Sequence, residues 1–161
     1  MEYFITETAL GTLCCALADG RIESISFLEG EAETAELRVA DGKLARLVDA
    51  PAWFTLENLA VGGNSGGIPN MRLSGSTFRL RVWEAVRRIP AGETATYGEI
   101  AEAIGQPKAV RAVASAVAAN KVAVLIPCHR IVRSGGAPGR YRWGASRKKS
   151  LLAYEKSLTG K

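Results

Sequence analysis

Apolar runs and turn residues in the first part of the chain predict a small sheet followed by helix. Residues 11–17 and 21–27 are two apolar-rich runs, and Asp19-Gly20 between them is a dipeptide typical of hairpin turns. Residues 31–59 are predicted to be mostly helical. Residues 61–70 are rich in glycine and contain a proline, so they predict a linker. The pattern therefore indicates an N-terminal sheet-and-helix domain over residues 1–70.

Beyond the linker, apolar positions recur at helical spacing. Phe78, Val82 and Val86 lie four residues apart and predict a helix over residues 77–88. A mostly helical second domain is therefore expected over residues 71–161.

Two further helices are predicted in this second domain. Thr96 and Glu99 have the spacing of a capping box, which starts a helix ending near Gly105. Pro107 suits the first turn of another helix, which reaches Ala119. The pair fits a helix-turn-helix, although an ordinary helical hairpin gives the same pattern.

Charge divides the chain at nearly the same place. Residues 1–75 carry 5 basic and 11 acidic side chains, whereas residues 76–161 carry 16 basic and 5 acidic ones. A basic half of this size is expected of a phosphate-binding surface, and a solvated basic face gives the same count. No apolar run approaches the ~18 residues of a membrane span, so we expect a soluble, cytoplasmic protein.

The cysteines indicate a reducing compartment and no metal. Cys14, Cys15 and Cys128 form no disulfide framework, and the neighbours Cys14 and Cys15 cannot easily bridge to each other. Zinc would need paired cysteines or a second histidine, and the chain has only one histidine. We interpret Cys14 and Cys15 as strand residues.

The candidate chemistry lies in residues 126–131, where Cys128 stands beside the chain's one histidine, His129. The apolar residues 122–125 predict a short strand-like run that shelters the thiol. A sheltered cysteine ionises poorly, so a reactive Cys128 would need a base or cationic surroundings. A small core cysteine beside a structural histidine is the alternative.

Several short motifs surround this Cys-His pair in the sequence. They are Thr-Tyr-Gly-Glu at residues 96–99, Arg111, Asn120 eight residues before Cys128, Gly-Arg-Tyr-Arg-Trp-Gly at 139–144 and Lys-Lys-Ser-Leu-Leu-Ala-Tyr-Glu at 148–155. Over residues 76–161 the chain resembles the O6-alkylguanine-DNA alkyltransferase family, most closely the C-terminal domain of bacterial adaptive-response proteins. Lys121 and Ala123 stand where many relatives have prolines. Whether the chain is an independent protein or a domain of a longer one stays open.

The resemblance implies an α+β fold, with a small supporting N-terminal domain and a C-terminal domain that carries a winged helix-turn-helix. It also implies direct-reversal DNA repair. Cys128 would take the alkyl group from O6-alkylguanine or O4-alkylthymine in DNA, after the nucleotide has flipped out of the duplex. An S-alkyl thioether has no good leaving group, so each protein would react once, without a cofactor.

Catalytic roles follow from the same resemblance. His129 would draw the proton from Cys128 through a water molecule, and Glu155 would orient His129. Asn120 would brace the backbone, and Tyr97 would press on a phosphate and donate to the leaving base.

The resemblance also implies the binding residues. In the substrate pocket, Tyr141 would stack on the purine, main-chain groups of Ile131 and Arg142 would read its edge, and Trp143 would narrow the space. The second helix of the helix-turn-helix carries mainly small residues and would enter the minor groove of double-stranded DNA. The implied DNA contacts are Thr96, Lys108, Arg111, Ala112, Ser115 and Ala116, with Arg111 inserted into the base stack. We expect a monomer.

Three other classes fit the sequence less well. A Cys-His hydrolase needs an oxyanion hole and a histidine that faces the sulfur, which adjacency in sequence makes awkward. A sequence-specific transcription factor needs long base-reading side chains on the second helix. A non-catalytic sensor of alkyl lesions is the main alternative, and such relatives replace the cysteine that this chain retains.

Overall fold

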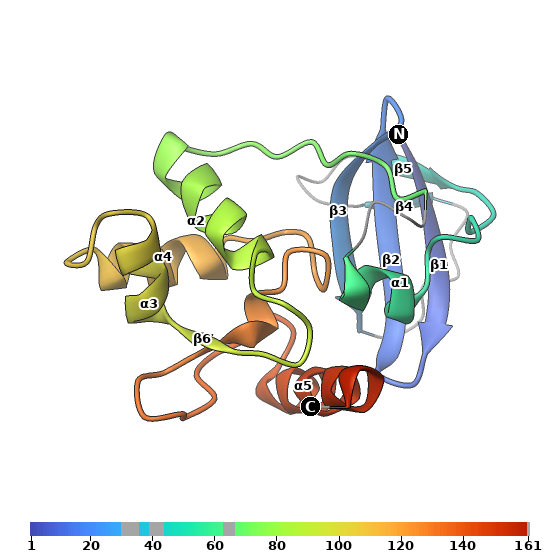
Figure 1. Ribbon diagram of the computed structural model, residues 1–161. Coiled ribbons are helices and arrows are strands. Elements are labelled where there is room, and N and C mark those ends of the chain that lie inside the picture. Colours follow the sequence, from blue (N-terminus) through green and yellow to red (C-terminus); the bar gives the residue numbers. More distant parts are fainter. Residues whose placement is uncertain (30–35, 39–43, 63–66, 161) are drawn as a thin grey trace. The chain divides into compact units, whose positions relative to one another are not determined.

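The computed structural model describes residues 1–29, 36–38, 44–62 and 67–160, which divide into two units (Figure 1). Unit 1 comprises Met1–Leu73 and Lys121–Leu125, and unit 2 comprises Ser74–Asn120 and Ile126–Lys161. The described helices and strands together make an α+β fold, as the sequence predicts. No helix in this described part is both long and apolar enough to cross a membrane.

Unit 1 is built on a five-stranded sheet in the order β3-β2-β1-β5-β4. Its elements are β1 (Glu2–Thr8), β2 (Gly11–Ala18), β3 (Arg21–Leu28), β4 (Glu36–Arg38), β5 (Leu44–Leu47) and α1 (Leu56–Val61). The predicted hairpin is confirmed, because β2 and β3 pair antiparallel across Asp19-Gly20. Both turn residues have positive φ, 50° and 73°, as a tight hairpin turn requires.

The prediction of helix over residues 31–59 is wrong for most of the described part. β4 and β5 are strands, and helix begins only at Leu56. β5 pairs in parallel with β1, at Glu2↔Arg46 and Tyr3↔Leu47, so a partner distant in sequence decides its conformation. Residues 30–35 and 39–43 lie outside the described residues, as do residues 63–66 of the predicted linker.

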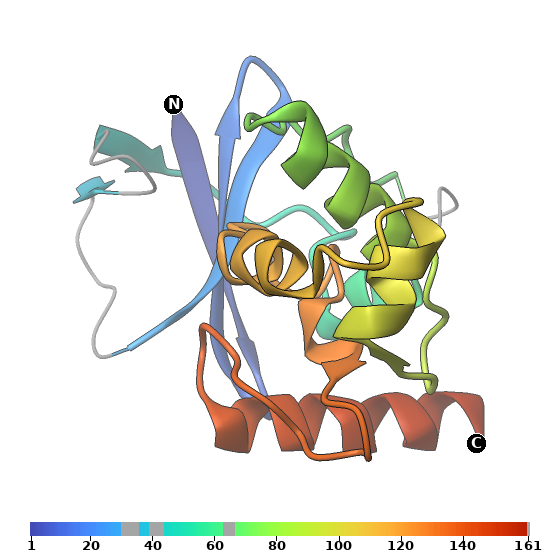
Figure 2. The same ribbon diagram turned by 90° about the vertical axis from the view of Figure 1, so that its left-hand side faces the viewer.

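Aromatic and small apolar side chains pack on the two faces of this sheet. Tyr3, Cys14 and Ala16 are buried on one face with Ala45. From the other face, the Phe4 ring meets Trp53 and Phe54 edge-on, with centroids 5.5 and 4.8 Å apart. α1 follows these two aromatic residues and lies beside the sheet of unit 1 (Figures 1 and 2). Cys14 and Cys15 are free, buried strand residues of β2, as predicted.

Unit 2 is mostly helical. Its elements are α2 (Thr77–Arg87), β6 (Ala95–Thr96), α3 (Tyr97–Ala103), α4 (Val110–Ala118), the 3-10 helix η3 (Cys128–Arg130), β7 (Ile131–Val132) and α5 (Ala145–Thr159). α2 agrees with the predicted helix, and the Thr96 capping box at the start of α3 is confirmed. α4 begins later than predicted, because a turn closed by Ala109 N–H donating to the Gln106 carbonyl (2.9 Å) precedes it.

Residues 121–125 are not the predicted strand-like run. Val122 makes an isolated parallel bridge with Ile25 of β3, and Val124 then turns with φ of 67°. Ile25 N–H donates to the Lys121 carbonyl (3.0 Å) and the Ile25 carbonyl accepts from Ala123 N–H (2.8 Å). This segment therefore belongs to unit 1, although unit 2 residues flank it in sequence.

Candidate active site

Cys128 is the first residue of η3 and is 4% exposed. The backbone here is a 3-10 turn. Pro127 precedes the turn, and Cys128 N–H donates to the Ile126 carbonyl (2.8 Å). Burial raises the pKa of the Cys128 thiol to about 12, while a hydrogen bond with Asn120 and the Lys148 charge act in the opposite direction. The thiol needs a base to react near neutral pH.

His129 lies next to this thiol and is fully buried. Its Nε2 is 2.6 Å from Oε1 of Glu155, which α5 supplies. Burial lowers the pKa of His129, and the Glu155 carboxylate works against that shift. Among the described residues the Nδ1 atom, although buried, has no hydrogen-bond partner. A neutral imidazole that donates from Nε2 to Glu155 therefore keeps Nδ1 as an acceptor for a proton.

Arg130 completes the buried charge cluster. Its Nε donates to both Glu155 carboxylate oxygens, each at 3.0 Å, its Nη2 also pairs with that carboxylate, and its Nη1 donates to the Ile89 carbonyl (2.6 Å). Burial alone would raise the pKa of Glu155, but the hydrogen bonds from His129 and Arg130 outweigh it and lower the pKa. Glu155 is thus a charged carboxylate that fixes the histidine ring.

Asn120 follows the C-terminal end of α4 and is buried. Its side-chain Nδ2 donates to the Ile126 carbonyl (3.2 Å), two residues before Cys128. Its main-chain carbonyl accepts from Arg142 Nη1 (3.0 Å). Asn120 therefore links α4 to the segment that carries the thiol.

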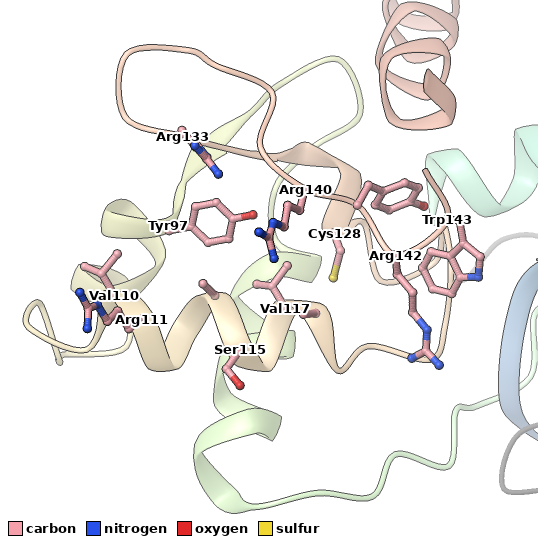
Figure 3. A pocket seen from close by; sticks show the side chains of 13 residues that line it. Tyr97, Val110, Arg111, Ser115, Val117, Cys128, Arg133, Arg140, Arg142 and Trp143 are labelled. Carbon is pink, nitrogen blue, oxygen red and sulfur yellow. The ribbon is translucent and has the colours of Figure 1, made fainter. Parts of the chain in front are cut away.

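A pocket of about 490 Å³ opens over the Cys128 thiol (Figure 3). Val110 and Arg111 lie toward one end of α4, Arg142 and Trp143 toward the other, and Cys128 lies between (Figure 3). The lining residues are Tyr97, Val110, Arg111, Ala114, Ser115, Val117, Ala118, Cys128, Arg133, Arg140, Tyr141, Arg142 and Trp143. None of these residues is acidic, and four are arginines, so the pocket favours an anionic or electron-rich ligand.

In and beside the pocket walls, aromatic side chains pack against one another and against the main chain. Tyr141 lies 5.4 Å from Trp143 and 6.3 Å from His129 between ring centroids. A Cβ built on Gly139, which has φ of 72°, would lie 3.4 Å from the Tyr97 hydroxyl. Burial raises the pKa of Tyr97, so its phenol stays protonated and able to donate.

Seven predicted site residues line this pocket: Tyr97, Arg111, Ser115, Cys128, Tyr141, Arg142 and Trp143. Thr96 is instead the N-cap of α3, and Lys108 and Ala112 are exposed outside the pocket lining.

Two predicted site residues are buried and lie outside the pocket lining. Ala116 is 1% exposed, and its carbonyl accepts from the Trp83 indole (2.8 Å). Ile131 is also buried; its N–H donates to the Cys128 carbonyl and its carbonyl accepts from Lys148. The contacts predicted for these two residues with DNA and with the purine stay predictions.

Lys148 is a site residue to which the sequence analysis assigned no role. It is fully buried, and its Nζ donates to the carbonyls of Ile131 (2.5 Å) and Arg140 (3.2 Å). Burial lowers its pKa to about 8, and the interaction with Cys128 works against that shift. Lys148 precedes Glu155 by two helical turns on α5, and this spacing was the signal that both face the site.

The chain matches a protein-family model and several curated proteins. The family model of the 6-O-methylguanine DNA methyltransferase DNA-binding domain matches residues 77–157. The chain is 59% identical over 83 residues to the bifunctional transcriptional activator/DNA repair enzyme Ada of Escherichia coli, a match that covers 52% of this chain and 23% of Ada. It is 48% identical over 90 residues to a probable methylated-DNA--protein-cysteine methyltransferase of Acanthamoeba polyphaga mimivirus, covering 56% of this chain and 60% of that protein.

A solved structure extends the likeness over nearly the whole chain. The crystal structure of Mycobacterium tuberculosis OGT in complex with DNA matches with a TM-score of 0.76 and 32% identity, covering 98% of this chain and 94% of OGT. The chain spans less than two thirds of the length of the curated relatives named above.

Proposed function

Because the chain belongs to the 6-O-methylguanine DNA methyltransferase family, we propose that it repairs DNA by moving an alkyl group from guanine O6 to Cys128. The observation that carries this proposal is the position of Cys128 in the pocket, with the buried His129–Glu155 pair beside it. The relative from Acanthamoeba polyphaga mimivirus is named for the same transfer, from methylated DNA to a protein cysteine.

The reaction follows from these groups. His129 Nδ1 takes the Cys128 proton through a water molecule, and Glu155 stabilises the imidazolium that results. The thiolate attacks the alkyl carbon, the carbon–oxygen bond breaks, and its electron pair stays on the guanine oxygen. Tyr97 donates a hydrogen bond to the leaving purine. The product is a thioether that water does not hydrolyse, so each molecule reacts once.

Access to the lesion requires the nucleotide to leave the base stack, because guanine O6 lies inside the duplex. In this proposal α3 and α4 form the helix-turn-helix, with residues 133–143 as its wing. The small exposed side chains of α4 enter the minor groove of double-stranded DNA, and Arg111 fills the space in the stack. The protein acts as a monomer, and O4-alkylthymine is a second substrate.

The experiment that tests this function measures the mass of each cysteine-containing peptide after incubation with excess duplex carrying O6-methylguanine. We expect one added methylene on the Cys128 peptide, at one equivalent, and none on the Cys14-Cys15 peptide. The Cys128→Ala variant should gain no mass. Tight binding without any mass change would instead support a lesion sensor, and neither binding nor transfer would make Cys128 a core residue.

Trp143 is expected to limit the size of the alkyl group, because its ring lines the pocket and is held there by contacts with the Tyr141 ring and the Arg142 guanidinium. Methyl should be transferred faster than benzyl by the native protein, and Trp143→Gly should raise the benzyl rate about tenfold relative to methyl. Single-turnover rates on the two substrates give this ratio. Equal native rates for methyl and benzyl would contradict the prediction.

A further inference from the structure

The Arg142 guanidinium touches two separate parts of the candidate site. Its Nη1 donates to the Asn120 main-chain carbonyl (3.0 Å), and its Cζ lies 5.6 Å from the centroid of the Trp143 ring. Arg142 and Trp143 both line the pocket (Figure 3). One side chain therefore connects a wall of the pocket to Asn120, two residues beyond the end of α4.

Asn120 is in turn hydrogen bonded to the segment that carries Cys128. Its Nδ2 donates to the Ile126 carbonyl (3.2 Å), which also accepts from the Cys128 N–H (2.8 Å). The Asn120 side chain also lowers the pKa of Cys128, against the larger effect of burial. Asn120 lies two residues beyond Ala118, the last residue of α4, near the helix end that favours a cationic donor. The contacts run from Trp143 through Arg142, Asn120 and Ile126 to Cys128.

We propose that Arg142 is a positioning residue for alkyl transfer: it holds Asn120, and through it the Ile126–Cys128 segment, in place and holds Trp143 in the pocket wall. This inference rests on the function proposed above. A lysine keeps the charge of Arg142 but lacks the planar group that donates to Asn120 and lies over the Trp143 ring. Substituting Arg142 with lysine or with alanine therefore separates the effect of its charge from the effect of its guanidinium contacts.

The test measures the single-turnover methyl-transfer rate at saturating O6-methylguanine duplex, as a function of pH, for Arg142→Ala and Arg142→Lys. The matched control is Lys149→Met, which removes one positive charge from an exposed position of α5 outside the pocket lining. The variants leave the other titratable and charged groups around Cys128 unchanged. These groups are Tyr97, His129, Tyr141, Lys148, Arg111, Arg133 and Arg140.

We expect Arg142→Ala to lower the saturated rate about tenfold, the effect of losing one hydrogen bond. The pH at which the rate is half-maximal should rise, because a loosened Asn120 stabilises the thiolate less. Arg142→Lys should regain DNA affinity without regaining the rate, and Lys149→Met should lose affinity without moving the pH midpoint.

A saturated rate and pH midpoint equal to those of the native protein in Arg142→Ala would overturn the proposal, as would the same rate loss in Lys149→Met. Native protein that transfers no methyl group would overturn the proposed function itself, and this outcome is visible before any variant is compared.

Discussion

Replacing Glu155 with glutamine should lower the free energy of unfolding by about 3–5 kcal/mol. The glutamine keeps the size of the side chain but leaves the Arg130 guanidinium, 4% exposed, without its counter-charge. His129 loses the carboxylate that fixes its ring, so the alkyl-transfer rate should fall on the order of 10²-fold or more. Urea unfolding and single-turnover kinetics measure the two effects.

The control for this prediction is Glu84→Gln. Glu84 also pairs with an arginine, Arg88, at 2.9 Å, but both side chains are mostly exposed. Its loss should change stability by less than about 1 kcal/mol. A Glu155→Gln variant as stable as this control would contradict the buried-cluster argument.

The acid limb of the stability curve gives a second readout of Glu155. Its pKa is lowered in the folded protein, so its contribution is present above the unfolded pKa of ~4.3 and is lost as pH falls through the lower folded pKa. The glutamine variant should lack this pH-dependent loss.

Replacing Lys148 with methionine should slow alkyl transfer on the order of 10²-fold, since it removes the buried cation whose charge favours the Cys128 thiolate. Because the folded pKa of Lys148 is about 8, below the unfolded value of ~10.4, its charge should be lost as pH rises past 8. The native rate should therefore show an alkaline decline that the variant lacks. Single-turnover rates between neutral and alkaline pH measure it.

Lys149→Met is the matched control for Lys148, because it removes the same charge from the next residue of α5, where the side chain is exposed. It should affect DNA affinity but not the shape of the pH profile. Equal rate losses in the two lysine variants would show that Lys148 acts through the general attraction of DNA.

Local sequence signals predicted the elements that depend on neighbouring residues. The Asp19-Gly20 turn, the helical spacing of α2 and the capping box of α3 all lie within a few residues of the structure they specify. β5 could not be predicted in this way, because its conformation depends on pairing with β1, some 40 residues earlier in the chain.

Residues of the candidate site could be predicted where they belong to a sequence motif. They could not be predicted where tertiary packing determines their position. The contact between His129 and Glu155 agrees with the motif spacing. The burial of Lys148 could not be predicted from hydropathy, because only the fold shows that two main-chain carbonyls accept hydrogen bonds from its Nζ. The catalytic and DNA-binding roles of the predicted residues stay predictions.

The pairing of residues 121–125 with β3 has a consequence for the order of assembly. β3 is an edge strand, and residues about 95 positions later provide hydrogen-bond partners for the main chain of Ile25. Contacts that close so long a loop form late in folding. A ribosome completes β3 long before it makes this segment, which ends three residues before Cys128. Cys128 can therefore take its place only after residues far beyond β3 have been synthesised, so the reactivity proposed for this thiol would appear late in the maturation of this part of the chain.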